Sequence, residues 1–342
     1  MNLKRKGLEI RGRTSAFVIA EAGANHNRDL KLAKELIDVA VEAEADAIKF
    51  QIYSAETMYS KKVPTHSGYS KNLWELIKEI ETPRGWIPEL ASYCREKGIV
   101  FFATPFDAAA VDDLDPHVAL YKIASFELVD YPLLEYTAKK GKPVILSTGM
   151  ASLGEIQEAV RVIEDAGNKD IVLLQCASTY PAVPSIMNLR AMETLRRAFP
   201  EAVVGLSDHT LGIHISVAAV AMGAKVIEKH FTLSRKMEGP DHPFAIEPDE
   251  LKALVRQIRD VEAALGDGRK DGPSPQEMEN YRIGRRSLHA RVDIPKGAVI
   301  SREMIIVKRP GLGIHPRFLD VVVGREARRD IEADAWLTWE MI

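Results

Sequence analysis

The chain is poor in cysteine and lacks long apolar runs, and each absence excludes a class of protein. Only Cys94 and Cys176 occur among 342 residues, which excludes a disulfide framework and predicts a reducing, cytoplasmic location. No apolar run is long enough to span a bilayer, and no signal-peptide core follows the basic first residues, so we expect no membrane partner. The formal net charge of −3 excludes the strongly basic balance typical of nucleic-acid binders.

The pattern of apolar runs predicts the fold. Eight short apolar runs alternate with amphipathic, helix-like stretches between residues 17 and 265. Because a parallel strand inside a barrel is buried on both faces, such runs indicate strands, and eight strand–helix repeats favour an α/β fold of the (β/α)8 TIM-barrel type. An open doubly wound sheet is the alternative, but it typically carries a Gly-rich phosphate loop after an early strand, which is not visible here. The runs are residues 17–20, 47–50, 99–103, 118–123, 143–146, 171–175, 202–206 and 225–228.

Composition changes near residue 266, and this predicts a second domain. Residues 266–284 are rich in Gly, Pro and charge, as linkers are. From residue 285 the pattern changes to short β-like pieces separated by Pro-Lys-Gly and Arg-Pro-Gly turns. We therefore predict a barrel domain at 1–265, a linker at 266–284 and a small β-rich domain at 285–342.

Two histidines stand where the last two apolar runs end. His209 and His230 would lie at the tips of neighbouring parallel strands, where two imidazoles can share one divalent cation. Asp208 and Glu228 are candidate hydrogen-bond partners of the two rings. Glu21, which follows the first run, could supply a third ligand or instead move a proton. Imidazole with oxygen ligands suits Mn²⁺ or Zn²⁺.

Two lysines lie inside apolar runs, where a charge is costly unless it meets a counter-charge. Lys49 and Lys122 therefore predict an anion site for phosphate or carboxylate. The alternatives are that each lysine pairs with a structural carboxylate, or that Lys122 forms a Schiff base in a pyruvate aldolase. Hydroxyl donors follow other runs at matching positions, namely Thr104, Ser125, Ser147 and Ser207.

Two further positions keep two interpretations each. Cys176 ends the sixth run and is either a nucleophile or a buried inert thiol. Asp241, in the Gly-Pro-Asp-His turn after the eighth run, either contacts a sugar hydroxyl or only shapes the turn.

Seven ordered motifs resemble the sialic acid (nonulosonic acid) synthases, including the pseudaminic acid synthases. They are Ala-Glu-Ala-Gly-Ala-Asn-His-Asn at 20–27, Lys-Phe-Gln at 49–51, Ala-Thr-Pro-Phe-Asp at 103–107, Lys-Ile-Ala-Ser-Phe-Glu at 122–127, Ser-Thr-Gly-Met at 147–150, and residues 205–210 and 228–232. Residues 285–342, with Lys-Arg-Pro-Gly at 308–311, resemble the antifreeze-like (SAF) domain of that family.

The resemblance implies an activity. These enzymes condense phosphoenolpyruvate with an N-acetylmannosamine-type sugar and give a nine-carbon 2-keto acid and phosphate. A divalent metal, usually Mn²⁺ with Mg²⁺, Co²⁺ or Zn²⁺ as alternatives, is held by the residues that match His209 and His230. The family forms homodimers in which each antifreeze-like domain covers the partner's barrel.

The resemblance also implies roles for individual residues. Glu21 matches the catalytic carboxylate. Phosphoenolpyruvate contacts match Lys49, Thr104, Lys122, Ser125, Ser147 and Ser207. Sugar contacts match Gln51, Glu127, Tyr180 and Asp241, and Arg309 matches an arginine that reaches the sugar from the neighbouring subunit.

Some positions depart from the sialic acid synthase pattern. Ser178 stands where those enzymes usually carry asparagine, and Phe126 replaces a small residue. The segment around residues 68–70 lacks an asparagine that family members use near the sugar. Residues 53–58 and 122–127 are more similar to the pseudaminic acid synthase branch, whose sugar is a 2,4-diacetamido-2,4,6-trideoxy hexose. A non-catalytic alternative, carbohydrate or ice binding through residues 285–342, leaves the polar residues of the barrel unexplained.

Overall fold

The computed structural model describes residues 15–64 and 72–342, so the difference predicted around residues 68–70 lies outside the described part of the chain. The chain divides into two compact units, the first ending at Gly266 and the second beginning at Asp267. Each unit is described by itself.

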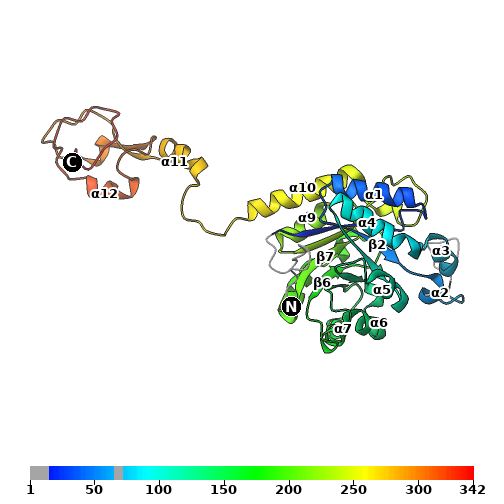
Figure 1. Ribbon diagram of the computed structural model, residues 1–342. Helices are drawn as coiled ribbons and strands as arrows, with labels where there is room; N and C mark the ends of the chain where they lie inside the picture. The colour runs from blue at the N-terminus through cyan, green and yellow to red at the C-terminus, as the bar shows by residue number, and fades with distance from the viewer. Residues whose placement is uncertain (1–14, 65–71) are drawn as a thin grey trace. The chain divides into compact units, whose positions relative to one another are not determined.

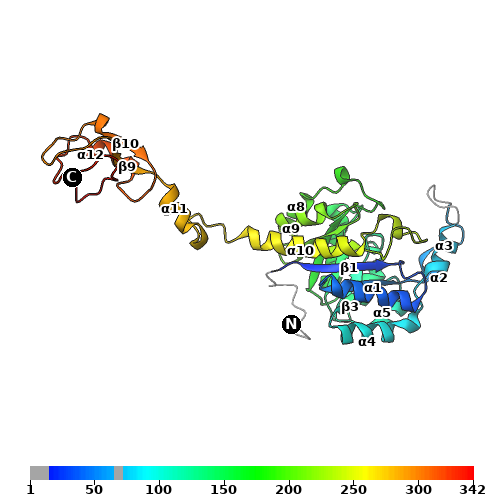
Figure 2. The ribbon, with the colours of Figure 1, turned by 90° about the horizontal axis from the view of Figure 1, so that it is seen from above.

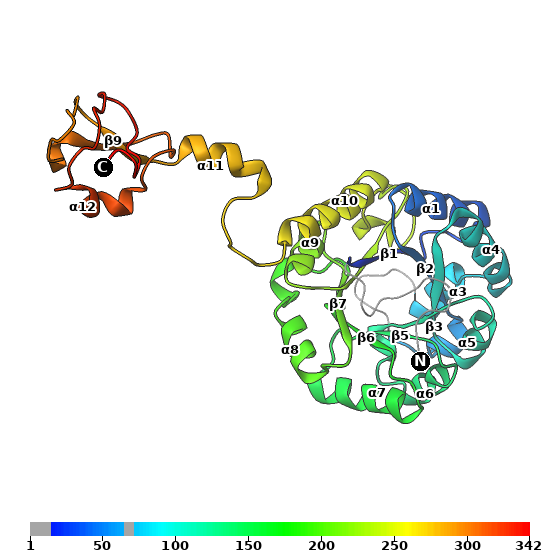
Figure 3. The same ribbon diagram turned by 60° about the vertical axis from the view of Figure 1, so that its left-hand side comes forward.

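Eight parallel strands of the first unit form the predicted barrel, which Figure 3 shows as a ring of strands inside a ring of helices. Each predicted apolar run contains one strand or overlaps it. Neighbouring strands in the order β3-β2-β1-β8-β7-β6-β5-β4 form paired ladders, and β3 and β4 lie at the two ends of this order. The strands are β1 (Phe17–Gly23), β2 (Ala47–Ile52), β3 (Val100–Pro105), β4 (Tyr121–Ile123), β5 (Val144–Ser147), β6 (Ile171–Cys176), β7 (Val203–Asp208) and β8 (Val226–His230).

Helices follow the strands and pack around the sheet (Figures 1 and 2). Their ends follow local rules: the Ser152 hydroxyl and the Glu155 side chain form a capping box at the start of α7, and Pro248 begins α10. Within the described residues, no helix is both long and apolar enough to cross a membrane. The helices are α1 (Leu30–Glu42), α2 (Ala55–Met58), α3 (Leu73–Ile80), α4 (Ile87–Lys97), α5 (Ala108–Leu114), α6 (Tyr131–Ala138), α7 (Leu153–Asp165), α8 (Ala191–Ala198), α9 (His214–Ala221) and α10 (Pro248–Leu265).

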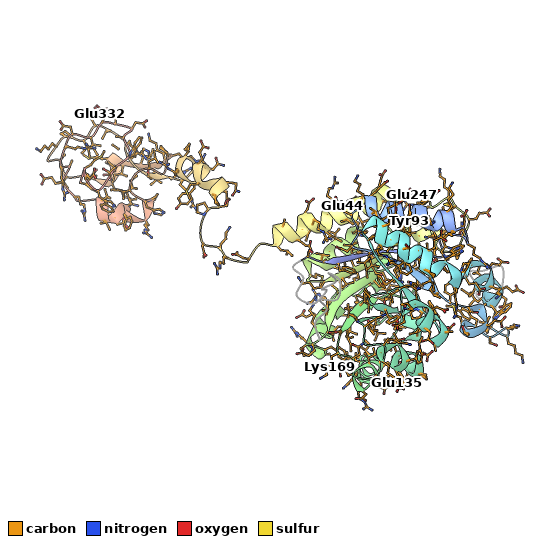
Figure 4. All side chains as sticks on the ribbon, in the orientation of Figure 1. Glu44, Tyr93, Glu135, Lys169, Glu247 and Glu332 are labelled. Carbon is orange, nitrogen blue, oxygen red and sulfur yellow. The ribbon has the colours of Figure 1, made fainter. Side chains whose placement is uncertain are left out.

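The barrel is filled mainly by apolar side chains, and charged residues such as Glu44, Glu135 and Lys169 are exposed on its outer surface (Figure 4). The exceptions include a set of buried polar residues near the carboxyl ends of the strands. Several of these strands run two residues beyond their apolar runs, so the polar residues belong to the ladders themselves. Glu21, for example, pairs in register with Lys49 on one side and with His230 on the other.

The second unit is a small fold with short strands. β9 (Ser287–Ala290) and β10 (Ile305–Lys308) pair antiparallel, and α12 (Leu319–Val322) lies beyond them. Isolated bridges such as Ile294 with Ile331 supply further backbone pairing. A cluster that includes Leu288, Ile300 and Leu337 forms a core separate from that of the barrel. Within residues 266–284, predicted as a linker, the structure has α11 (Met278–Gly284), which follows a capping box formed by Ser274 and Glu277.

Candidate active site

The predicted site residues of the barrel come from the carboxyl ends of its strands, where the active sites of such barrels lie. Side chains alternate along each strand, so residues two positions apart share a face. Lys49 and Gln51 share a face of β2 in this way, as do Glu228 and His230 on β8. Six of these residues are less than 5% exposed, namely Glu21, Lys49, Thr104, Lys122, Ser147 and Ser207.

The two lysines meet at one carboxylate. Lys49 Nζ lies 3.5 Å from Glu228 Oε1, and Lys122 Nζ lies 3.4 Å from the same oxygen. Lys49 also contacts Glu21 Oε2 at 2.7 Å and donates to Thr104 Oγ1 at 3.0 Å. Each lysine therefore has a carboxylate partner, as expected if the lysines only form structural ion pairs. Both ammonium groups also converge on one place, as expected for an anion site.

Burial and the neighbouring charges shift the pKa values of the two carboxylates in opposite directions. Burial raises the pKa of Glu21, and Lys49 opposes this only in part. Burial also acts to raise the pKa of Glu228, but the charges of Lys122 and Lys49 outweigh it and lower that pKa. Burial acts to lower the pKa of Lys49, and the carboxylates of Glu21 and Glu228 outweigh it, so the net shift is upward. The two lysines thus share Glu228, the carboxylate whose pKa their charges lower.

Lys122 differs from Lys49 in its environment. Burial and the neighbouring charge of Lys49 lower the pKa of Lys122, and the attraction of Glu228 does not compensate. A buried lysine with fewer counter-charges is the one that gains most from an incoming anion.

The two histidines lie side by side near the ends of β7 and β8. Their ring centroids are 5.4 Å apart, and the Tyr180 ring packs against both, with centroid distances of 4.2 Å to His209 and 6.1 Å to His230. His209 Nδ1 lies 2.9 Å from the Ala177 carbonyl oxygen and so donates to it. Metal-binding imidazoles commonly donate their other ring N–H to a backbone carbonyl in this way. The bond leaves the lone pair of His209 Nε2 pointing away from the backbone.

His230 has a different neighbour from the one expected. Its Nδ1 is buried without a hydrogen-bond partner and lies 4.0 Å from Asp241 Oδ2. Burial lowers the pKa of His230 well below its usual value, so the ring is neutral and able to bind a metal. In the described part of the chain, no group of three or more His, Cys, Asp or Glu side chains is arranged to hold a metal. His209 and His230 are the two imidazoles that could hold a cation here, and water or substrate oxygens would then fill its other positions.

Two carboxylates take places other than those considered from the sequence, and Glu21 fits one of the two roles considered for it. Asp208 points away from the rings and binds Lys229, Thr210 and Ser216. Glu228 lies between the two lysines rather than beside a histidine. Glu21 accepts from Gln51 Nε2 at 2.7 Å and pairs with Lys49, an arrangement that suits proton transfer rather than metal binding.

The remaining predicted residues of the barrel lie around this centre. Ser125 Oγ accepts a hydrogen bond from the Gly149 backbone at 3.0 Å. A Cβ at Gly149 would lie 2.2 Å from Ser178 Oγ, so only glycine fits there. Ser207 pairs in register with both Cys176 and Glu228.

Glu127 follows β4 and lies within range of the charge on Lys122. Burial raises its pKa to about 7, and its buried Oε2 has no hydrogen-bond partner. Arg309 is exposed in the second unit.

Unpartnered buried polar atoms gather among these residues. Buried polar atoms in folded proteins almost always have a partner, so such a group indicates a ligand site. The atoms are Ser147 Oγ, Ser178 Oγ, Glu127 Oε2, Glu228 Oε2 and His230 Nδ1.

Sequence reasoning did not assign Glu228 to the anion site. The indication was present, because Glu228 lies two residues before His230 on one strand and therefore shares its inward face.

The fold and the polar carboxyl end of its strands define a TIM-barrel enzyme followed by a small accessory domain. Comparison with known proteins agrees: residues 36–270 match the NeuB family and residues 285–342 match the SAF domain. The chain belongs to the NeuB family.

Relatives in that family carry the names of three acid synthases. The chain is 44% identical over 327 residues to the N,N'-diacetyllegionaminic acid synthase of Campylobacter jejuni, covering 93% of this chain and 97% of that protein. It is 39% identical over 325 residues to the pseudaminic acid synthase of the same species, covering 92% and 93%. The solved N-acetylneuraminic acid synthetase of Leptospira borgpetersenii is 39% identical, with a TM-score of 0.71 over 78% of this chain and 90% of that one.

Proposed function

We propose that this protein is a nonulosonic acid synthase that condenses phosphoenolpyruvate with an N-acetylmannosamine-type sugar in its open-chain form. The methylene carbon of phosphoenolpyruvate bonds to the sugar's aldehyde carbon, and the aldehyde oxygen takes up a proton. Water then adds to the resulting oxocarbenium carbon and loses a proton. Cleavage of the carbon–oxygen bond to phosphate gives the nine-carbon 2-keto acid and inorganic phosphate.

One observation carries the proposal: two buried lysines and two buried imidazoles lie at the same end of one barrel. The ammonium groups of Lys49 and Lys122 both approach Glu228, and His230 shares the inward face of β8 with that carboxylate. A phosphate and a carboxylate on one small molecule suit two ammonium groups and several hydroxyls. The hydroxyls in this role are those of Thr104, Ser125, Ser147 and Ser207.

His209 and His230 are the residues that would hold a divalent cation, with Mn²⁺ as the first expectation. When bound, such a cation supplies Lewis-acid polarisation of an aldehyde oxygen. The chain contributes the neutral state of His230, the fixed tautomer of His209 and the wall formed by the Tyr180 ring.

We assign to Glu21 the exchange of a proton with the attacking water. Burial raises the pKa of Glu21, which makes its carboxylate a stronger base once ionised. Gln51 Nε2 and Lys49 Nζ hold its two oxygens, so its orientation is fixed before substrate arrives.

The sugar would lie between the histidines, the end of β2 and the loops that follow β4, β6 and β8. Gln51, Glu127, Tyr180 and Asp241 are its proposed contacts. Arg309 would reach it from a second copy of the chain, in a homodimer whose second unit covers the partner's barrel. A 2,4-diacetamido-2,4,6-trideoxy hexose, the sugar of a pseudaminic acid synthase, is the competing substrate, and the 39% identity to such a synthase supports it.

The test is a phosphate-release assay with Mn²⁺ and phosphoenolpyruvate against a panel of sugars. N-acetylmannosamine, its 6-phosphate and 2,4-diacetamido-trideoxy hexoses are compared, each with metal-free and sugar-free controls. We expect phosphate only when metal, phosphoenolpyruvate and sugar are all present. Release at the same rate without any sugar would refute the synthase assignment.

A lysine-dependent pyruvate aldolase is the second candidate, because burial lowers the pKa of Lys122 as imine chemistry requires. Borohydride reduction in the presence of pyruvate would then trap a covalent adduct on Lys122, and chelators would leave the activity unchanged. We expect no adduct, since the ammonium group of Lys122 is engaged by Glu228.

A further inference from the structure

The loops after the first and the last strand of the barrel are joined by side-chain hydrogen bonds. Asn25 Nδ2 donates to the Phe231 carbonyl at 2.7 Å, and Asn27 Nδ2 donates to the Glu238 carbonyl at 3.0 Å. His242 Nε2 lies 3.2 Å from Asn27 Oδ1. These bonds extend the backbone pairing of β1 and β8 beyond the ladder itself.

The protonation of this bridge is determined by its partners. Because Asn27 Nδ2 donates to Glu238, its Oδ1 can only accept, so His242 Nε2 must carry the proton. His242 Nδ1 then accepts from the Thr232 hydroxyl, 2.6 Å away. Burial lowers the pKa of His242, which agrees with the neutral ring that this arrangement needs. His242 is fully buried, whereas Asn27 is exposed.

Two glycines allow the loops to approach this closely. Gly239 has φ +147°, and a Cβ there would lie 2.7 Å from the His242 ring and 3.1 Å from Asn27 Oδ1. Gly23 has φ +51° and follows a register shift in β1, and its Cβ would lie 2.4 Å from Asp241 Oδ2. Asn27 itself has φ +47°, a conformation that asparagine and glycine adopt more readily than other residues.

The residue held by this bridge is Asp241. It precedes His242, accepts from the Ala24 backbone at 3.0 Å, and places Oδ2 4.0 Å from His230 Nδ1. We infer that Asn27 and His242 are positioning residues that fix Asp241 against His230 and thereby set the affinity of the site for its sugar. This inference rests on the proposed function for the identity of the sugar, but the bridge itself is a property of the free protein.

The test separates the bridge itself from its effect on sugar affinity. Asn27→Gly keeps the positive φ and removes both side-chain bonds, so it removes the bridge without backbone strain. His242→Gln retains a donor near the Nε2 position, whereas His242→Leu removes both ring bonds. Lys236→Ala is the matched control, because Lys236 is exposed in the same loop and its side chain makes no described hydrogen bond.

Two readouts are taken on the full chain. Hydrogen exchange of residues 231–246 without substrate reports on the bridge alone. Steady-state kinetics with Mn²⁺ then separate KM for the sugar from KM for phosphoenolpyruvate.

We expect faster exchange in Asn27→Gly, with KM for the sugar raised roughly five- to tenfold and KM for phosphoenolpyruvate changed less than about twofold, the effect of one or two lost hydrogen bonds. His242→Gln should recover most of the affinity that His242→Leu loses, and Lys236→Ala should match the wild type.

Faster exchange with an unchanged KM for the sugar would overturn the positioning role, as would equal rises in both KM values. Unchanged exchange in Asn27→Gly would overturn the bridge itself. Failure of the wild type to release phosphate with any sugar would refute the proposed function, while the exchange result would still decide whether the bridge holds the loop. If His242→Leu does not fold, Asn27→Gly on the exposed side decides the outcome alone.

Discussion

Removal of the carboxylate shared by the two lysines gives the sharpest prediction. In Glu228→Gln the side chain keeps its shape and one oxygen, but Lys49 and Lys122 lose a common counter-charge at 3.5 and 3.4 Å. At an effective dielectric constant of about 20, each pair contributes roughly 5 kcal/mol of gross Coulomb attraction. Most of this is cancelled by the cost of burying the charges, and loss of one partner from a buried pair typically costs about 3–5 kcal/mol.

We therefore expect Glu228→Gln to lower the free energy of unfolding by about 3 kcal/mol, the lower end of that range, because glutamine still accepts one hydrogen bond. Phosphoenolpyruvate should replace the missing charge. Its stabilising effect on the variant should therefore exceed its effect on the wild type, and its dissociation constant should fall at least about tenfold.

The assay is urea unfolding followed by far-ultraviolet circular dichroism, with and without phosphoenolpyruvate. Glu135→Gln is the matched control, since Glu135 is exposed and its pairing with Lys139 across one helical turn is worth less than about 0.5 kcal/mol. If Glu228→Gln proved as stable as the wild type and gained no more from phosphoenolpyruvate, the idea that Glu228 anchors both lysines would be wrong.

Three further changes test other parts of the site. His230→Ala should abolish the dependence of turnover on added Mn²⁺ and most of the turnover, and the control is Mn²⁺ binding measured by calorimetry. Arg309→Ala should raise KM for the sugar more than KM for phosphoenolpyruvate. Mixing Arg309→Ala chains with Glu21→Gln chains should restore some activity if the second unit covers the partner's barrel. No restored activity would indicate that the second unit covers the barrel of its own chain. Glu127 keeps its proton up to about pH 7 in the folded state but ionises near 4.5 when unfolded, so its contribution to stability is present at pH 4.5 and is lost as the pH rises through 7. Glu127→Gln should therefore gain about 2 kcal/mol relative to the wild type between pH 5 and 7.5 in urea unfolding, and a constant difference would contradict the raised pKa.

The sequence was sufficient to predict the barrel, because parallel strands that are buried on both faces have nearly continuous apolar sequences. The sequence also indicated which strands end in polar residues. Lys49, for example, is a charged residue in the apolar run Ala-Ile-Lys-Phe, and its burial is costly unless an opposite charge is near. A local conflict of this kind, in a sequence that otherwise agrees with its fold, is typical of a functional site.

What the sequence could not determine was which charges meet across the barrel. Glu228 contacts lysines on β2 and β4, and these strands are not its neighbours in the sheet. Such contacts depend on the closed geometry rather than on local spacing. Asp208 was likewise placed near the histidines because it precedes one of them, but strand alternation turns its side chain outward to Lys229.

The alternation of inward and outward side chains on β7 and β8 has a consequence for how the chain can change. Inserting or deleting a single residue in either strand would turn His230 or His209 outward and bring Lys229 or Asp208 into the reaction chamber. Length changes at this end of the barrel are therefore tolerable only in the connecting loops or in steps of two. A redesign of the specificity of this barrel should therefore keep the lengths of β7 and β8 unchanged or change them by an even number of residues.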